Sequence, residues 1–137
     1  ADAAVGPISS FERDLVASLL KVRETAPNAL ALLRDIAVDL PSISAAIDGL
    51  NMRLDAMANR GIDVDALPFE AAYGRTSMEY YDGFVFGFSS NAGLNIPPVA
   101  TGGRDDALTV ILGGGIGVPA VGGVIRPDLV ALVEAAK

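Results

Sequence analysis

Cysteine and histidine are both absent from the 137 residues of this chain. Their absence excludes a Ser-His-Asp triad, a cysteine nucleophile, a disulfide framework and zinc sites built from histidine or cysteine. Aromatic residues are also scarce, at 6% of the chain, and much of the 51% apolar share is alanine and valine. The length suits one domain, whose core must depend on small side chains.

Basic residues are few, because 10 lysines and arginines stand against 17 aspartates and glutamates, which gives a net charge of −7. An acidic surface repels phosphate, so we expect no binding to nucleic acid. No stretch reaches the roughly 18 apolar residues that a membrane-spanning helix needs. Residues 1–6 also lack the basic region of a signal peptide. We therefore expect a cytoplasmic protein without membrane association, which the absence of cysteine also fits.

Residues 1–66 contain few glycines and are expected to form amphipathic helices. Ser9 and Glu12 have the spacing of a capping box at the start of the first helix. Pro27 suits the first turn of a second helix, and Gly61 suits the left-handed position after the last turn of a third. Apolar residues repeat at helical spacing in all three segments, so we interpret them as the stripes of an ordinary core.

The remaining residues, 67–137, hold twelve of the fifteen glycines and are expected to form mainly strands. Short connections between successive strands favour an antiparallel sheet, because parallel pairing needs crossover connections. A closing helix is expected to open at residues 126–128. Helices followed by strands indicate the α+β class. The five expected strands cover residues 69–73, 84–88, 99–103, 107–112 and 120–125.

Two motifs in this half of the chain look like chemical sites but do not qualify. Gly115 to Ala120 fits the dinucleotide pattern G-x-G-x-x-A, which must open a helix in order to bind a pyrophosphate. Here the motif leads into an expected strand and Pro119 lacks an amide donor, so we interpret it as a flexible hairpin. The carboxylates of Asp105 and Asp106 would point to opposite faces of a strand, and we interpret them as turn and surface charges.

Tyr80-Tyr81 and Gly102-Gly103-Arg104 are the most unusual combination in the sequence. A tyrosine pair offers aromatic walls with polar tips, and paired glycines let a ligand lie against the backbone. An arginine supplies a fixed fork for a carboxylate or phosphate. One interpretation is a small pocket for a polar ligand, lined by two strands. The other, equally compatible with these residues, is an aromatic core beside a tight turn.

The same segments carry a resemblance to a known family. Residues 79–86, Glu-Tyr-Tyr-Asp-Gly-Phe-Val-Phe, resemble the L-D-Y-Y-T-G-x-V-F element that lines the histidine pocket of histidyl-tRNA synthetases. Residues 101–108, Thr-Gly-Gly-Arg-Asp-Asp-Ala-Leu, resemble the G-G-R-Y-D-x-L element of that family, with Asp105 in place of its tyrosine. Residues 113–125 look like the stretch that leads into class II motif 3.

Departures from the synthetase pattern favour a non-catalytic relative. Thr76 stands where the synthetases carry a catalytic arginine, and the residues at 126–129 offer no arginine at the place that binds ATP. The sequence also ends at Lys137, where a synthetase continues into an anticodon-binding domain. This pattern is similar to that of the ATP phosphoribosyltransferase regulatory subunits, which are catalytically silent paralogues of the synthetase.

The resemblance implies the antiparallel sheet of a class II aminoacyl-tRNA synthetase-like core in residues 67–137, with residues 1–66 as an N-terminal helical insertion. It implies a non-catalytic subunit of histidine biosynthesis that a short-form catalytic ATP phosphoribosyltransferase subunit needs for activity and for feedback control by histidine. We expect a homodimer within a hetero-oligomer. Class II motifs 1 and 2 would precede Ala1, so we also expect a C-terminal fragment of a longer polypeptide.

On the same basis, Tyr80, Tyr81, Gly102, Gly103 and Arg104 would line a pocket for histidine, with no catalytic residue, metal ion or cofactor. Two alternatives stay open. One is a fragment of a catalytic histidyl-tRNA synthetase, and the other is an unrelated interaction domain in which these elements coincide by chance. The resemblance predicts above all that Tyr81 and Gly103 lie side by side on neighbouring strands.

Overall fold

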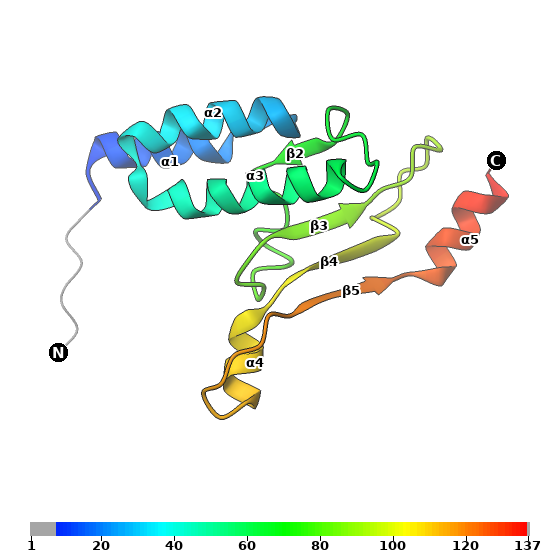
Figure 1. Ribbon diagram of the computed structural model, residues 1–137. Coiled ribbons are helices and arrows are strands. Elements are labelled where there is room, and N and C mark those ends of the chain that lie inside the picture. Colours follow the sequence, from blue (N-terminus) through cyan, green and yellow to red (C-terminus); the bar gives the residue numbers. More distant parts are fainter. Residues whose placement is uncertain (1–7, 137) are drawn as a thin grey trace. The chain divides into compact units, whose positions relative to one another are not determined.

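The computed structural model describes residues 8–136, which form two compact units divided between Ala72 and Tyr73. Figure 1 shows that the first is mainly helical and the second is built on a three-stranded sheet. The protein is of the α+β class with small antiparallel sheets, as predicted.

The helical unit contains α1 (Ser10–Leu20), β1 (Arg23–Thr25), α2 (Ala26–Asp39), the 3-10 turn η1 (Pro41–Ile43), α3 (Ser44–Ala58) and β2 (Pro68–Glu70). The sheet unit contains β3 (Val85–Phe88), β4 (Ala100–Arg104), α4 (Asp106–Leu112), β5 (Val121–Ile125) and α5 (Pro127–Ala135). No helix within residues 8–136 is long and apolar enough to cross a membrane.

The helices of the first unit begin and end at the predicted signals. The backbone N–H of Glu12 donates to Ser9 Oγ at 3.1 Å, and the backbone N–H of Ser9 donates to Glu12 Oε2 at 2.9 Å. These hydrogen bonds form the predicted capping box, and they hold the pKa of Glu12 below its usual value. Pro27 lies in the first turn of α2, and Gly61 adopts a φ of 78° beyond the end of α3.

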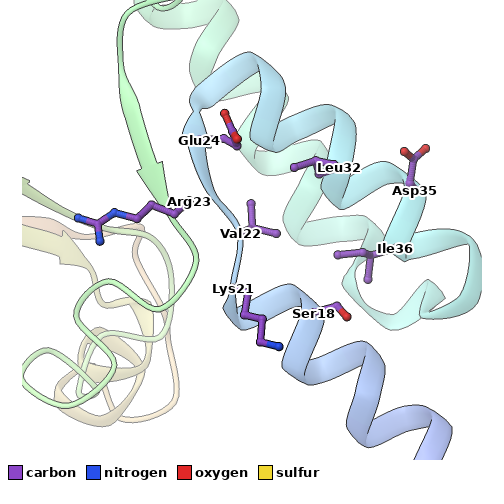
Figure 2. A pocket seen from close by; sticks show the side chains of 8 residues that line it. All are labelled: Ser18, Lys21, Val22, Arg23, Glu24, Leu32, Asp35 and Ile36. Atoms are coloured by element: carbon purple, nitrogen blue, oxygen red, sulfur yellow. The ribbon is translucent and has the colours of Figure 1, made fainter.

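A cleft of about 340 Å³ lies where α1, β1 and α2 meet (Figure 2). Aliphatic side chains of Val22, Leu32 and Ile36 line it, together with Lys21 at the end of α1. The Arg23 side chain is directed away from these aliphatic groups in Figure 2. Helix α1 contains no buried residue. The cleft is therefore the loosely packed side of the helical unit.

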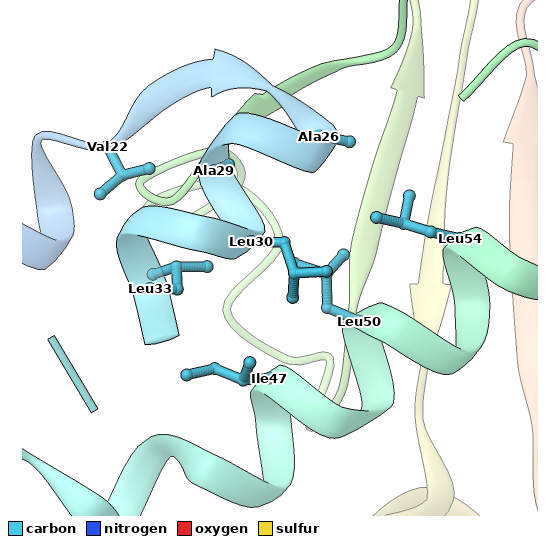
Figure 3. Close-up of a cluster of buried hydrophobic side chains, with 8 residues drawn as sticks. All are labelled: Val22, Ala26, Ala29, Leu30, Leu33, Ile47, Leu50 and Leu54. Atoms are coloured by element: carbon cyan, nitrogen blue, oxygen red, sulfur yellow. The ribbon is translucent and has the colours of Figure 1, made fainter. Parts of the chain in front are cut away.

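The core of the helical unit is a single cluster of aliphatic side chains (Figure 3). Leu30 and Leu33 of α2 meet Ile47, Leu50 and Leu54 of α3, and all five are buried. The smaller side chains of Val22, Ala26 and Ala29 complete the cluster. This confirms the prediction that the apolar stripes of the second and third helices form an ordinary core of small and medium side chains. The same prediction is wrong for the first helix, because α1 has no buried residue and Phe11 of its expected stripe is 59% exposed.

A short strand pair ties residues beyond α3 to the helices. β1 and β2 pair in antiparallel orientation, and the backbone N–H of Ala71 donates to the carbonyl oxygen of Val22 at 3.0 Å. The strand predicted for residues 69–73 is therefore wrong in its second half, because β2 ends at Glu70. The chain turns instead at Gly74, whose φ of 76° suits glycine and is incompatible with an extended strand.

The sheet unit is an antiparallel sheet in the order β3-β4-β5, with β4 at its centre. Gly103 of β4 stands opposite Val85 of β3 on one side and Gly122 of β5 on the other. The antiparallel pairing is as predicted. Residues 115–120 lead into β5 and not into a helix, which confirms that this glycine run is not a dinucleotide fingerprint.

Residues 107–112 form helix α4, so the prediction of a strand there is wrong. Asp105 is the N-cap of this helix, and its Oδ1 accepts a hydrogen bond from the backbone N–H of Leu108 at 3.0 Å. Gly113 ends the helix and donates its N–H to the carbonyl oxygen of Thr109 at 2.8 Å. The capping residue and the closing glycine outweigh the strand preference of the β-branched residues between them.

Candidate functional site

The aromatic ring of Tyr81 lies on Gly103 at the centre of the sheet. A β-carbon at Gly103 would lie 2.6 Å from Cγ and 2.7 Å from Cδ2 of Tyr81. These distances are far shorter than van der Waals contact, so only glycine leaves room for the ring. Tyr81 and Gly103 therefore lie side by side, as the resemblance predicted, but not on neighbouring strands, because Tyr81 precedes β3 and lies outside any strand. The contact of the Tyr81 ring with Gly103 is the centre of the candidate site.

Tyr80 extends this aromatic surface towards solvent. The ring centroids of Tyr80 and Tyr81 are 4.3 Å apart and their planes are inclined by 35°. Tyr80 is 64% exposed, whereas Tyr81 is half-buried. A hydrogen bond between the two side chains raises the pKa of Tyr81, and its partial burial and the nearby charge of Asp105 act in the same direction. A phenol whose pKa is raised by a hydrogen bond is the donor of that bond, so the O–H of Tyr81 is directed at Tyr80. The hydroxyl of Tyr80 is therefore the one whose proton is left for a ligand.

Gly102 faces the other side of the sheet, because successive residues of a strand point to opposite faces. A β-carbon there would lie 2.6 Å from Cζ of Phe86 and 2.9 Å from Cα of Gly123. Phe86 stands directly opposite Gly102 in the β3–β4 register. Only glycine fits at this position, because a side chain would collide with the ring of Phe86 and with the backbone of β5. Gly102 therefore does not lie beneath the tyrosine pair.

Arg104 follows two residues after Gly102 and is held by a carboxylate of its own chain. Its Nε and Nη2 both donate to Asp106 Oδ2, at 2.9 and 2.7 Å. The hydrogen bond from Arg104, and then that from the backbone N–H of Ala120, lower the pKa of Asp106. The arginine that was expected to offer its fork to a ligand is thus bound to Asp106, and the ion pair joins the end of β4 to the start of α4.

The five predicted site residues therefore lie on two sides of β4. Tyr80, Tyr81 and Gly103 are brought together on one face, whereas Gly102 and Arg104 belong to the other. The tyrosine face is the candidate ligand surface. The opposite face carries the ring pairs of Phe84 with Phe86 and of Phe86 with Phe88, whose centroids are 6.2 and 5.8 Å apart.

Asp82 was not among the residues predicted from the sequence, although it directly follows Tyr81. Its Oδ1 accepts the backbone N–H of Asp106 at 3.0 Å and its Oδ2 accepts that of Ala107 at 2.7 Å. The signal that could have identified Asp82 from the sequence was its position as an acidic residue directly after the tyrosine pair. Its partners could not be inferred, because they belong to a helix that the sequence pattern did not predict.

Other parts of the structure do not add to this site. Within residues 8–136, no group of three or more acidic side chains is placed to hold a metal ion. The cleft of Figure 2 is lined entirely by residues of the helical unit and includes none of the five predicted residues. The candidate site is thus the tyrosine face alone, formed by Tyr80, Tyr81 and Gly103.

Comparison with protein-family models gave no match, and comparison with solved structures gave none either. Curated proteins, however, include relatives that cover most of the chain. It is 36% identical over 94 residues to a protein of Allorhizobium ampelinum, which is 69% of this chain and 24% of the relative. It is 33% identical over 117 residues to one of Agrobacterium fabrum, which is 85% and 30%. It is 31% identical over 110 residues to one of Brucella canis, which is 80% and 29%.

All three relatives are regulatory subunits, a class of proteins named for control and not for catalysis. Each is an ATP phosphoribosyltransferase regulatory subunit, and this chain is a homologue of those proteins, as the resemblance predicted. The names are consistent with the non-catalytic role expected from the sequence. The chain spans between 24% and 30% of the length of these relatives.

Proposed function

We propose that the chain is part of a non-catalytic regulatory subunit of ATP phosphoribosyltransferase in histidine biosynthesis. The observation that carries this proposal is the 31–36% identity to proteins of that name over 69–85% of the chain. The proposed function includes a short-form catalytic partner, a homodimer within the hetero-oligomer, and a cytoplasmic location. In the proposed fold, β3, β4 and β5 belong to a class II synthetase-like antiparallel sheet.

We further propose that histidine binds on the tyrosine face. Tyr80 and Tyr81 supply an aromatic wall for the imidazole, and the phenol of Tyr80 donates a hydrogen bond. Gly103 lets the ring of Tyr81 lie close to the sheet. Asp105 uses Oδ1 to cap α4, which leaves its second oxygen as an acceptor for an imidazole N–H.

Gly102 and Arg104 contribute to the proposed site indirectly, because they determine the packing and the end of strand β4. Gly102 lets the other face of β4 pack against Phe86, and Arg104 fixes the end of the strand through Asp106. Histidine would control the transferase by binding one arrangement of the complex more tightly than another, since a ligand shifts an equilibrium only by its differential affinity.

Tyr81→Ala tests this function in a complex of the regulatory polypeptide with its catalytic partner. The variant removes an aromatic wall from the proposed site and the phenol that holds the hydroxyl of Tyr80 in place, so we expect half-maximal inhibition to need about tenfold more histidine. The measurement is transferase activity against histidine concentration.

Phe88→Ala is the matched control, because Phe88 is an exposed aromatic residue on the opposite face of the same sheet. It should leave the histidine response unchanged. An identical histidine response in the wild type and in Tyr81→Ala would rule out the tyrosine face as the effector site.

A further inference from the structure

We infer that Asp82 is a positioning residue, whose carboxylate holds the ring of Tyr81 over Gly103 by fastening the tyrosine segment to the start of α4. No part of the resemblance assigns a role to this residue. The inference deepens the proposed function, because it concerns the geometry of the surface on which histidine is proposed to bind.

The carboxylate of Asp82 makes two bonds to a segment that is distant in sequence. Its two oxygens accept the backbone N–H groups of Asp106 and Ala107, at 3.0 and 2.7 Å, and these residues lie 24 and 25 positions further along the chain. Hydrogen bonds from amides to a carboxylate are charge-assisted and stronger than those between neutral groups. Asp105 already provides the local cap of α4. That cap accepts only the N–H of Leu108, so Asp82 satisfies the N–H groups of the first two residues of α4 and at the same time joins two segments that are distant in sequence.

The neighbours of Asp82 contact the same short stretch of chain. Tyr81 covers Gly103, and the backbone N–H of Gly83 donates to the carbonyl oxygen of Arg104 at 3.2 Å. Three consecutive residues thus contact the end of β4 and the first turn of α4. Asp82 makes the two side-chain hydrogen bonds in this contact. Because these bonds fix the backbone at residue 82, they also fix the direction of the side chain of Tyr81, which directly precedes it.

The local backbone of Tyr81 does not fix its ring by itself. Its N–H donates to the carbonyl oxygen of Met78 at 3.2 Å, which is a bond within a turn. The residue lies outside any helix or strand. Besides the two bonds of Asp82, the segment is joined to the end of β4 by the Gly83 N–H, and the ring itself by a backbone hydrogen bond from Gly103, by dispersion contacts and by the neighbouring, mostly exposed Tyr80.

Asp82→Ala in the isotope-labelled chain tests the inference by nuclear magnetic resonance. We expect the protons of Gly103 to lose the ring-current shift that the overlying Tyr81 ring causes. We also expect the pKa of Tyr81, followed through its own ring signals, to fall towards the ordinary value for tyrosine. Histidine affinity of the same chain should fall about tenfold, which corresponds to about 1.4 kcal/mol of binding free energy.

Two further variants separate positioning from general stability. Asp82→Asn loses the charge but keeps one acceptor oxygen, so the Gly103 shift should lie between those of the wild type and Asp82→Ala. Asp128→Ala removes an equal charge from the first turn of α5, and both signals should stay at their wild-type values. A purely structural role of Asp82 would lower the unfolding midpoint and leave both signals in place.

Unchanged Gly103 and Tyr81 signals in folded Asp82→Ala would overturn the inference. If Asp82→Ala does not fold, Asp82→Asn decides in the same way, because it keeps the size of the side chain. Failure of the wild-type chain to bind histidine would instead refute the proposed function. The positioning role of Asp82 would then be judged on the two spectroscopic signals alone.

Discussion

Gly102→Ala is expected to lower the free energy of unfolding of the sheet unit by about 1 to 3 kcal/mol, the usual range for an added methyl group in a packed interior. The new β-carbon would lie 2.9 Å from Cα of Gly123 and closer still to the carbonyl oxygen of Gly122. Both are backbone atoms of β5, so the collision cannot be relieved by rotating a side chain. The strands must move apart, which weakens the β4–β5 ladder.

Tyrosine fluorescence during urea unfolding measures this effect selectively. The chain has no tryptophan, and its three tyrosines, Tyr73, Tyr80 and Tyr81, all lie in the sheet unit. Gly122→Ala is the matched control, because it adds the same methyl group to the neighbouring strand, where nothing lies within 4 Å of it. We expect the control to stay within about 0.5 kcal/mol of the wild type. Equal losses of unfolding free energy in Gly102→Ala and Gly122→Ala would contradict the close packing of β5 against Gly102.

Leu50→Ala is expected to lower the free energy of unfolding of the helical unit by about 2 to 5 kcal/mol. Leu50 is 9% exposed and belongs to the cluster formed with Leu30 and Leu33. Its truncation removes buried apolar surface and leaves a cavity between α2 and α3. Because native domains are stable by only about 5 to 15 kcal/mol, the loss is a large part of the total.

Far-ultraviolet circular dichroism during urea unfolding measures this loss, because helices α1, α2 and α3 all belong to the helical unit. Met52→Ala is the control, since Met52 lies on the same helix and is 71% exposed. It should change stability by less than about 0.5 kcal/mol. A loss for Met52→Ala as large as that for Leu50→Ala would contradict the assignment of the core.

Helix boundaries were predictable where a local signal marks them. The capping box of Ser9 and Glu12, the proline at position 27 and the glycine at position 61 all act within one turn of the residue that carries them. Helix α4 was missed because Thr109, Val110 and Ile111 are β-branched and favour strands. Its formation depends on the Asp105 cap and on bonds from Asp82, which no hydrophobic pattern reveals.

The candidate site was predictable only in part, and for a comparable reason. The contact of Tyr81 with Gly103 followed from the resemblance of two segments to one family. Gly102 and Gly103 were assigned to the same pocket, although adjacent strand residues point to opposite faces and only Gly103 meets the tyrosine. The hydrogen bonds of Asp82 depend on how distant segments fold together, so they could not be predicted from spacing.

A chemical-shift titration of the chain with histidine tests the proposed effector site most directly. We expect saturable shifts that centre on Tyr81 and Gly103, with Asp105 among the affected residues, and that Tyr81→Ala abolishes. Shifts that do not saturate, or that centre on the cleft lined by Val22 and Ile36, would contradict the proposal that histidine binds on the tyrosine face.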